Sequence, residues 1–208
     1  MRLDRIIPTK LTLPALQAAA STCTGCDLYK HATQTVFGEG ASRPKIFLVG
    51  EQPGDQEDRV GHPFVGPAGN ILDQALAEAG ILRKDIYVTN AVKHFKWEPQ
   101  GKRRKHKKPS ANEIAACRPW LEAEVRMLNP RVIVCLGVTA AQSVFGKVVR
   151  LHEMRGRSSD TPFAPHVFVT VHPSAILRHP EKDQRDLEYH RFVNDLRHVV
   201  QFLHAQAA

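Results

Sequence analysis

The sequence predicts an α/β fold in which helices cover both faces of a central, mostly parallel four-stranded sheet, so that the domain has three layers. Four short runs rich in branched apolar residues have the length of buried strands, and helical patterns separate them. These runs are Ile46 to Gly50, Ile86 to Asn90, Val132 to Leu136 and Val167 to Val171. Strands that alternate with helices pair in parallel through crossover connections, and this order places helices on both faces of one sheet.

Four segments have the periodicity or the end signals of helices: residues 68–79, 110–128, 139–145 and 183–203. The first places apolar side chains at spacings of three and four, and it ends at Gly80. The second begins with a capping box from Ser110 to Glu113 and ends before Pro130. Each of these helices is expected to pack an apolar face against the sheet.

Length and composition are those of one globular domain spanning residues 1–208. With 42% apolar and 24% charged residues, the chain is unlike disordered or coiled-coil sequences. No apolar run reaches the length of a membrane span, and the charged N-terminal residues make a poor signal peptide. We therefore expect a cytoplasmic monomer that does not associate with membranes.

The positive charge is concentrated in one segment. The net charge is +8, and residues 93–108 hold eight Lys and Arg side chains against one acid, Glu98. Its densest part, from Gly101 to Pro109, is expected to be too dense in charge to pack, and therefore flexible or held by an anion such as phosphate. Phe95 and Trp97 lie among these charges, where they could stack on nucleobases. The segment therefore indicates a nucleic-acid partner.

Polar residues end three of the predicted strands. Glu51, Asn90 and His172 each lie at a strand end, and the carboxyl ends of parallel strands meet at one edge of a sheet. This edge would hold an acid, an amide that can read a base edge, and an imidazole in one cleft. The two longest predicted loops, 51–67 and 91–109, leave the same edge.

His106 is the most reactive candidate in the basic segment. Lys105 and Lys107 flank it, and like charges disfavour protonation of an imidazole. The ring is therefore expected to be neutral and nucleophilic near pH 7.

The cysteines favour a metal or buried thiols over disulfides, because a chain of this length folds without cross-links. Cys23 and Cys26 form a CxxC pair, and Cys117 and Cys135 stand apart. The pair alone is compatible with a redox site, half of a zinc site or half of an iron–sulfur site.

Five segments together resemble the uracil-DNA glycosylase superfamily, specifically its iron–sulfur family four, almost from end to end. They are GEQPG at 50–54, GHPFVGPAG at 61–69, TNAVKH at 89–94, AACRPW at 115–120 and VHPSAILR at 171–178. Gln52, the Lys93-His94-Phe95 segment and the KRRKH sequence at 102–106 depart from ordinary family-four patterns. They resemble the UdgX group, which becomes covalently attached to uracil-containing DNA and usually reads KRRIH. Lys105 here replaces the isoleucine.

The resemblance implies a uracil-DNA glycosylase-like fold and uracil excision from single-stranded DNA or from a flipped base. Phe64 would stack on the uracil, Asn90 would bind its edge, and groups around Gln52 would complete its recognition. His172 would donate a hydrogen bond to uracil O2, and Glu51 would stabilise the oxocarbenium-like sugar or position the group that attacks it.

By the same resemblance, His106 would attack C1′ of the sugar and form the covalent adduct. Positively charged side chains would hold the DNA phosphates: Lys102, Arg103, Arg104 and Arg178. A [4Fe–4S] cluster would be held by Cys23, Cys26, His94 and Cys117, with Cys135 as a competing fourth ligand. The spacing alone is also compatible with zinc.

Two other functions remain open at this level. The first is a conventional uracil-DNA glycosylase with many turnovers, in which the basic segment only grips phosphate. The second is a metal-stapled nucleic-acid-binding module without catalysis, in which the three polar strand ends are accidental neighbours.

Overall fold

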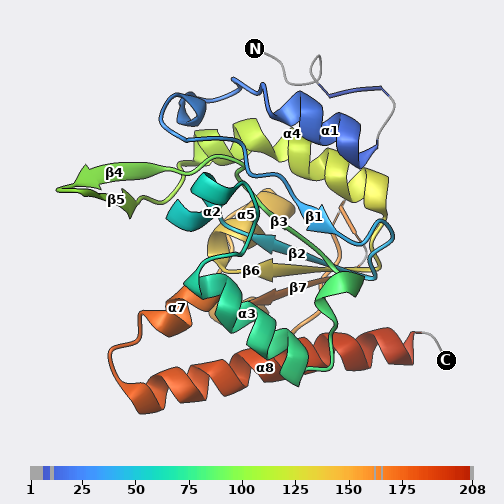
Figure 1. Cartoon of the computed structure of the whole chain (residues 1–208). Coiled ribbons are helices and arrows are strands. Elements are labelled where there is room, and N and C mark those ends of the chain that lie inside the picture. Colours follow the sequence, from blue (N-terminus) through green and yellow to red (C-terminus); the bar gives the residue numbers. More distant parts are fainter. Residues whose placement is uncertain (1–6, 10–11, 162, 165, 207–208) are drawn as a thin grey trace.

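A five-stranded sheet forms the centre of the protein (Figure 1), seen in a computed structural model that describes residues 7–9, 12–161, 163–164 and 166–206. The strand order is β1-β3-β2-β6-β7. The four predicted strands are confirmed as β2 (Ile46–Gly50), β3 (Tyr87–Asn90), β6 (Val132–Leu136) and β7 (Val167–Thr170), and all of them pair in parallel. The fifth strand, β1 (Glu39–Gly40), is antiparallel to β3 and has only two residues, too few to carry a strand pattern.

Helices cover both faces of this sheet, which confirms the predicted three-layer α/β class. One face packs against α3 (Pro67–Glu78), α7 (Pro173–Leu177) and α8 (Lys182–Ala205). The other face packs against α4 (Ala111–Leu128) and α5 (Val138–Phe145), and α1 (Leu13–Ala20) lies on α4. Strands β2 and β6 are fully buried because apolar layers lie above and below them.

The helix end signals in the sequence act as expected. Ser110 is the N-cap of α4: its hydroxyl accepts from the Glu113 amide at 3.3 Å, and the Glu113 carboxylate accepts from the Ser110 amide at 2.6 Å. Asn129 ends this helix in the left-handed conformation, directly before Pro130. The helix continues through Pro119, which the sequence pattern did not single out.

The two long loops at the carboxyl edge were wrongly expected to lack secondary structure. The first contains α2 (Asp55–Val60), and the second contains a hairpin of β4 (Trp97–Gln100) and β5 (Arg103–His106). Three further short elements are η2 (Asp27–Lys30), η3 (Arg83–Asp85) and α6 (Leu151–Met154). None of the described helices is long and apolar enough to cross a membrane.

Candidate active site

A pocket of about 470 Å³ is lined by residues at the carboxyl ends of the parallel strands, from the hairpin and from α7. Figure 1 shows that the hairpin and α7 both lie on the side of the sheet where these strands end. The size of the pocket suits a small organic ligand. Its lining contains Glu51, Gln52, Phe64, Asn90, His106, His172 and Arg178. The three polar strand ends that the sequence singled out therefore share one cavity, together with the histidine of the basic segment.

The floor of the pocket is a slot for a flat ring. Gly50 and Asn90 are neighbours in the β2–β3 ladder, and a Cβ on Gly50 would collide with Asn90 Oδ1 and the Phe64 ring. Phe64 has a φ of 58°, a left-handed conformation that is strained for an aromatic residue. Its ring lies 6.1 Å from that of His172, at an interplanar angle of 26°. The buried Asn90 amide therefore faces a space bordered by a phenyl ring and an imidazole.

Glu51 lies between a hydroxyl and the candidate nucleophile. Its Oε2 accepts a hydrogen bond from Thr139 Oγ1 at 2.5 Å, and its Oε1 lies 3.4 Å from His106 Nε2. Thr139 lies at the start of α5, directly after β6, and is 2% exposed. The sequence reasoning missed this residue, although its position three residues after the end of a strand pointed to the same edge.

The ring of His106 favours the neutral form, as the sequence predicted, but the cause is different. Burial lowers its pKa first and the positive charge of Arg178 lowers it further, whereas Glu51 raises it. The flanking lysines were wrongly named as the cause. Lys107, for example, is paired with Glu98 at 2.9 Å on the outside of the hairpin.

His172 is the N-cap of α7 and lines the pocket. Its Nδ1 accepts a hydrogen bond from the Ser174 amide at 3.2 Å. Burial lowers the pKa of His172 to about 4, assisted by the charges of Arg178 and His106. The imidazole is therefore neutral at pH 7.

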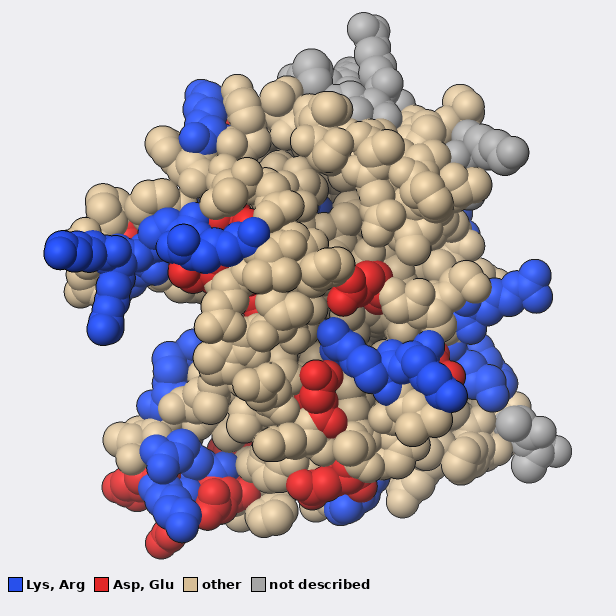
Figure 2. All heavy atoms as spheres, viewed as in Figure 1, with Lys and Arg blue, Asp and Glu red and all other residues tan. Residues whose placement is uncertain are grey.

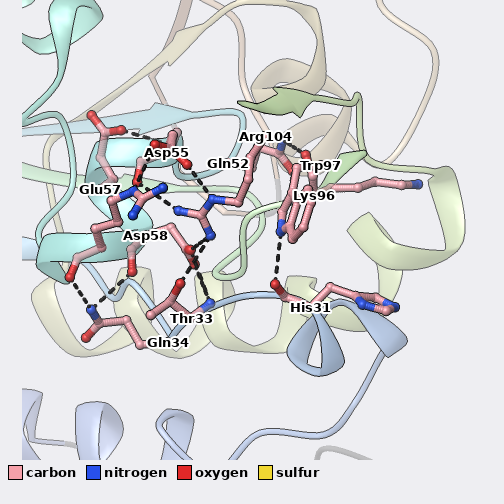
Figure 3. A network of polar contacts seen from close by, with 12 residues as sticks. His31, Thr33, Gln34, Gln52, Asp55, Glu57, Asp58, Lys96, Trp97 and Arg104 are labelled. Atoms are coloured by element: carbon pink, nitrogen blue, oxygen red, sulfur yellow. Dashed lines mark hydrogen bonds and ion pairs between the residues drawn. The ribbon is translucent and has the colours of Figure 1, made fainter. Parts of the chain in front are cut away.

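The hairpin is held in place through Arg104, which the sequence had assigned to DNA phosphates (Figure 3). Its Nε donates to Asp55 Oδ1 at 2.5 Å and its Nη1 donates to Asp58 Oδ2 at 2.6 Å. The guanidinium carbon lies 5.4 Å and 5.5 Å from the ring centroids of Phe95 and Trp97. Arg104 is thus occupied inside the protein, and the basic segment packs because two carboxylates of α2 neutralise this one charge.

Trp97 and Gln52 also hold the hairpin in place. Trp97 Nε1 donates to the carbonyl of His31 at 2.9 Å, and its ring faces Arg104, so its expected stacking on a nucleobase is not supported. The Gln52 side chain binds main-chain groups on both sides of the hairpin, at Lys96 and Lys107. Only the main chain of Gln52 is left to contact a base.

Lys102 and Arg103 are exposed at the turn of the hairpin, which extends from the molecule as a positively charged arm (Figure 2). Arg178 lies at the rim of the pocket. These three predicted DNA contacts are open to solvent, unlike Arg104.

A second, small cavity brings together the four predicted metal ligands. Cys23 and Cys26 reach it from the segment after α1, His94 from the segment after β3 and Cys117 from α4. Cys135 does not line this cavity. It lies in β6 inside the apolar core, so it does not compete to be the fourth ligand.

Thiols and an imidazole around this cavity are ligands of the kinds that bind iron–sulfur clusters or zinc. Within the described part of the chain, no three His, Cys, Asp or Glu side chains form a group arranged to hold a metal ion. The sulfurs of Cys23 and Cys117 already accept N–H hydrogen bonds at 3.3 Å, from Trp120 Nε1 and from the Lys93 amide. Burial raises the pKa of Cys117 to about 12, so a bound cation is needed to hold it as a thiolate.

Fold and site together define an α/β protein whose ligand pocket lies at the carboxyl ends of its parallel strands. The profile of the uracil DNA glycosylase superfamily matches residues 37–197. The chain belongs to this superfamily.

Its relatives include two enzymes named Type-4 uracil-DNA glycosylase. The protein of Thermotoga maritima is 42% identical over 164 residues, which are 78% of this chain and 82% of the relative. The protein of Pyrobaculum aerophilum is 33% identical over 177 residues, covering 82% and 87% of the two chains. A Type-5 uracil-DNA glycosylase of Thermus thermophilus is 32% identical over 158 residues, covering 67% and 68%.

Proposed function

We propose that this protein excises uracil from DNA and becomes attached to the resulting sugar through His106. The names of the Type-4 relatives support uracil excision. The attachment is supported by one observation above all: His106 Nε2 borders the pocket 3.4 Å from Glu51 Oε1, so an uncharged nucleophile and a carboxylate border the same space. The substrate is a uracil nucleotide in single-stranded DNA or flipped from a duplex.

Binding uses the slot and the charged arm. The uracil ring stacks against Phe64, and the Asn90 amide binds its polar edge. Lys102 and Arg103 neutralise phosphates along the strand, so affinity falls as salt concentration rises.

Bond cleavage uses charge stabilisation on both sides of the glycosidic bond. The C1′–N1 bond breaks, and its electron pair leaves on the uracil, where His172 Nε2–H stabilises the negative charge at O2. Glu51 stabilises the positive charge that develops on the sugar. The uracil anion then takes a proton from water.

The sugar cation is captured by the lone pair of His106 Nε2, which forms a bond to C1′. The ring becomes an imidazolium and then loses its Nδ1 proton to water. The protein is consumed, because this bond replaces the one that water would form in a hydrolytic enzyme.

The proposal includes a [4Fe–4S] cluster held by Cys23, Cys26, His94 and Cys117. Bound there, the cluster would have a structural part, because its four ligands come from the segment after α1, from α4 and from the segment that follows Asn90.

The test is incubation with a short deoxyuridine oligonucleotide, followed by a denaturing gel and intact mass measurement. The wild-type mass should increase by the oligonucleotide minus uracil, with one uracil released per protein. His106→Ala should abolish this increase, and His198→Ala, at an exposed histidine of α8, should keep it.

Two results contradict parts of the proposal. A denaturant-resistant adduct in His106→Ala excludes this residue as the nucleophile. Many uracils released per wild-type protein show a conventional glycosylase instead, with the hairpin serving only DNA binding. If His106→Gly admits water, it should release uracil repeatedly and leave an abasic product.

A further inference from the structure

One buried carboxylate joins two of the loops that border the pocket. Glu57 lies in α2, is 8% exposed and lines the pocket, yet the proposed reaction does not use it. Its Oε2 accepts a hydrogen bond from the Gly54 amide at 3.0 Å, and its Oε1 accepts one from the Gly66 amide at 2.8 Å. Both carboxylate oxygens therefore bind main-chain groups, one in each loop.

Each of these two amides belongs to the N-cap residue of a helix. Gly54 directly precedes α2, and Gly66 directly precedes α3. The start of a helix has amide donors without partners inside the helix and carries partial positive charge, so a carboxylate is stabilised there. Glu57 makes no ion pair in the described part of the chain, whereas Asp58 beside it pairs with Arg104. The charge of Glu57 is therefore stabilised by the amides at two helix N-termini.

Glu57 also holds the segment that carries Phe64 at both of its ends. The Gly61 amide donates to the main-chain carbonyl of Glu57 at 2.7 Å, and the Gly66 amide donates to its side chain. Phe64, between them, keeps a left-handed conformation, and such strain persists only where surrounding contacts enforce it. A Cβ on Gly69 would collide with the Phe64 carbonyl oxygen, so the first turn of α3 packs directly against this residue. The backbone of Phe64 is therefore fixed from α2 and from α3.

We propose that Glu57 is a positioning residue, whose carboxylate fixes the loop of Phe64 against the loop of Gly54 and so sets where the Phe64 ring lies in the pocket. The inference rests on the proposed function, in which this ring stacks on the uracil. A base that leaves the DNA exchanges stacking on neighbouring bases for stacking in the pocket. A Phe64 ring that is no longer held in place stacks less well. Fewer uracils then occupy the pocket, and release slows even when all the DNA is bound.

The first test is amide hydrogen exchange without DNA. Glu57→Gln keeps the volume of the side chain but turns an NH₂ group, which only donates, toward one of the two amides. One hydrogen bond is lost, and exchange across residues 61–66 should accelerate by about tenfold. Glu57→Asp keeps the charge but is too short to reach both amides, and it should give the same acceleration. Glu122→Gln is the matched control at a carboxylate of α4 that is 42% exposed and pairs with Arg118, and it should leave this exchange unchanged.

The second test is single-turnover uracil release at saturating protein. Phe64→Ala should slow release by roughly 10- to 100-fold, the range that corresponds to loss of stacking on one base. Glu57→Gln should slow it by about tenfold, because the ring is displaced and not removed. Since Glu57 acts through this ring, adding Glu57→Gln to Phe64→Ala should slow release by less than about twofold further. Affinity for the same oligonucleotide with thymine in place of uracil should not change, because the charged arm binds its phosphates.

Two results would overturn the inference. Unchanged exchange at residues 61–66 in Glu57→Gln would show that the carboxylate does not hold this loop. An equal loss of rate with and without the Phe64 ring would show that Glu57 acts on the reaction independently of the ring. If the wild type releases no uracil, the excision proposal is wrong instead, and the exchange of residues 61–66 still decides whether Glu57 holds the loop.

Discussion

Removing the Arg104 guanidinium should free the hairpin that carries His106. In Arg104→Met, Asp58 loses its charged partner although its own side chain is 0% exposed. Loss of one partner of a buried ion pair costs about 3 kcal/mol or more, whereas the partly exposed Asp55 pair adds about 0.5 kcal/mol. A free-energy change of 1.4 kcal/mol changes an equilibrium constant tenfold. A loss of about 3 kcal/mol therefore shifts the equilibrium between closed and open hairpin toward the open form by roughly 100-fold.

Two measurements follow this change. Amide hydrogen exchange in β4 and β5 should accelerate by about 100-fold if the pair holds the hairpin closed. Attachment to deoxyuridine DNA should slow by about 10- to 100-fold, because His106 is no longer held beside the pocket. Uracil release should fall less, since Asn90 and His172 lie on the strand ends and not on the hairpin.

Two variants serve as controls. Arg103→Met changes the neighbouring exposed arginine and should leave hairpin exchange unchanged. Adding Asp58→Asn to Arg104→Met removes the unpaired buried charge, so unfolding free energy should recover by about 1–2 kcal/mol without restoring attachment. Unchanged exchange in Arg104→Met would refute the view that this clamp orders the hairpin.

Four further predictions concern other parts of the molecule. Glu124 is fully buried, and its carboxylate accepts a hydrogen bond from Lys93 Nζ at 2.5 Å. Glu124→Ala should therefore lower the unfolding free energy by about 3–5 kcal/mol, as measured by chemical denaturation. Cys117→Ala should lose iron and visible absorption, whereas Cys135→Ala, in the core of the sheet, should retain both. The rate of uracil release should fall as the pH falls through about 4, where His172 becomes protonated. Between pH 6.5 and 4 the unfolded chain binds a proton at this histidine that the folded chain does not, so unfolding free energy should decrease as pH falls. A rate that falls with a midpoint near 6.5 would contradict the burial of this ring.

The parallel sheet could be predicted because its strands are short apolar runs between amphipathic helices. Glu51, Asn90 and His172 could be placed at one edge for the same reason, since parallel strands deliver their carboxyl ends to one side. The same reasoning places Thr139 near this edge, but its hydrogen bond to Glu51 could not be predicted, because that contact depends on how α5 packs against the end of β2. The two-residue strand β1 lacked any pattern of its own.

The basic segment shows where reasoning from charge density fails. Eight positive charges suggested a solvated loop, yet Arg104 packs between Phe95 and Trp97 and pairs with Asp55 and Asp58. Its acidic partners lie more than forty residues earlier in the chain. Sequence spacing carries no information about such a pairing.

By itself, the sequence determined the four parallel strands, the longer helices that cover them and the caps of those helices, because periodicity and end signals are local. It also determined which reactive side chains stand at strand ends, because connection order decides the direction of each strand. The tertiary structure decided which of those side chains are neutral, which are occupied and which face the pocket. Burial and charge pairing depend on residues brought together from distant parts of the chain, and those distances arise only when the layers pack.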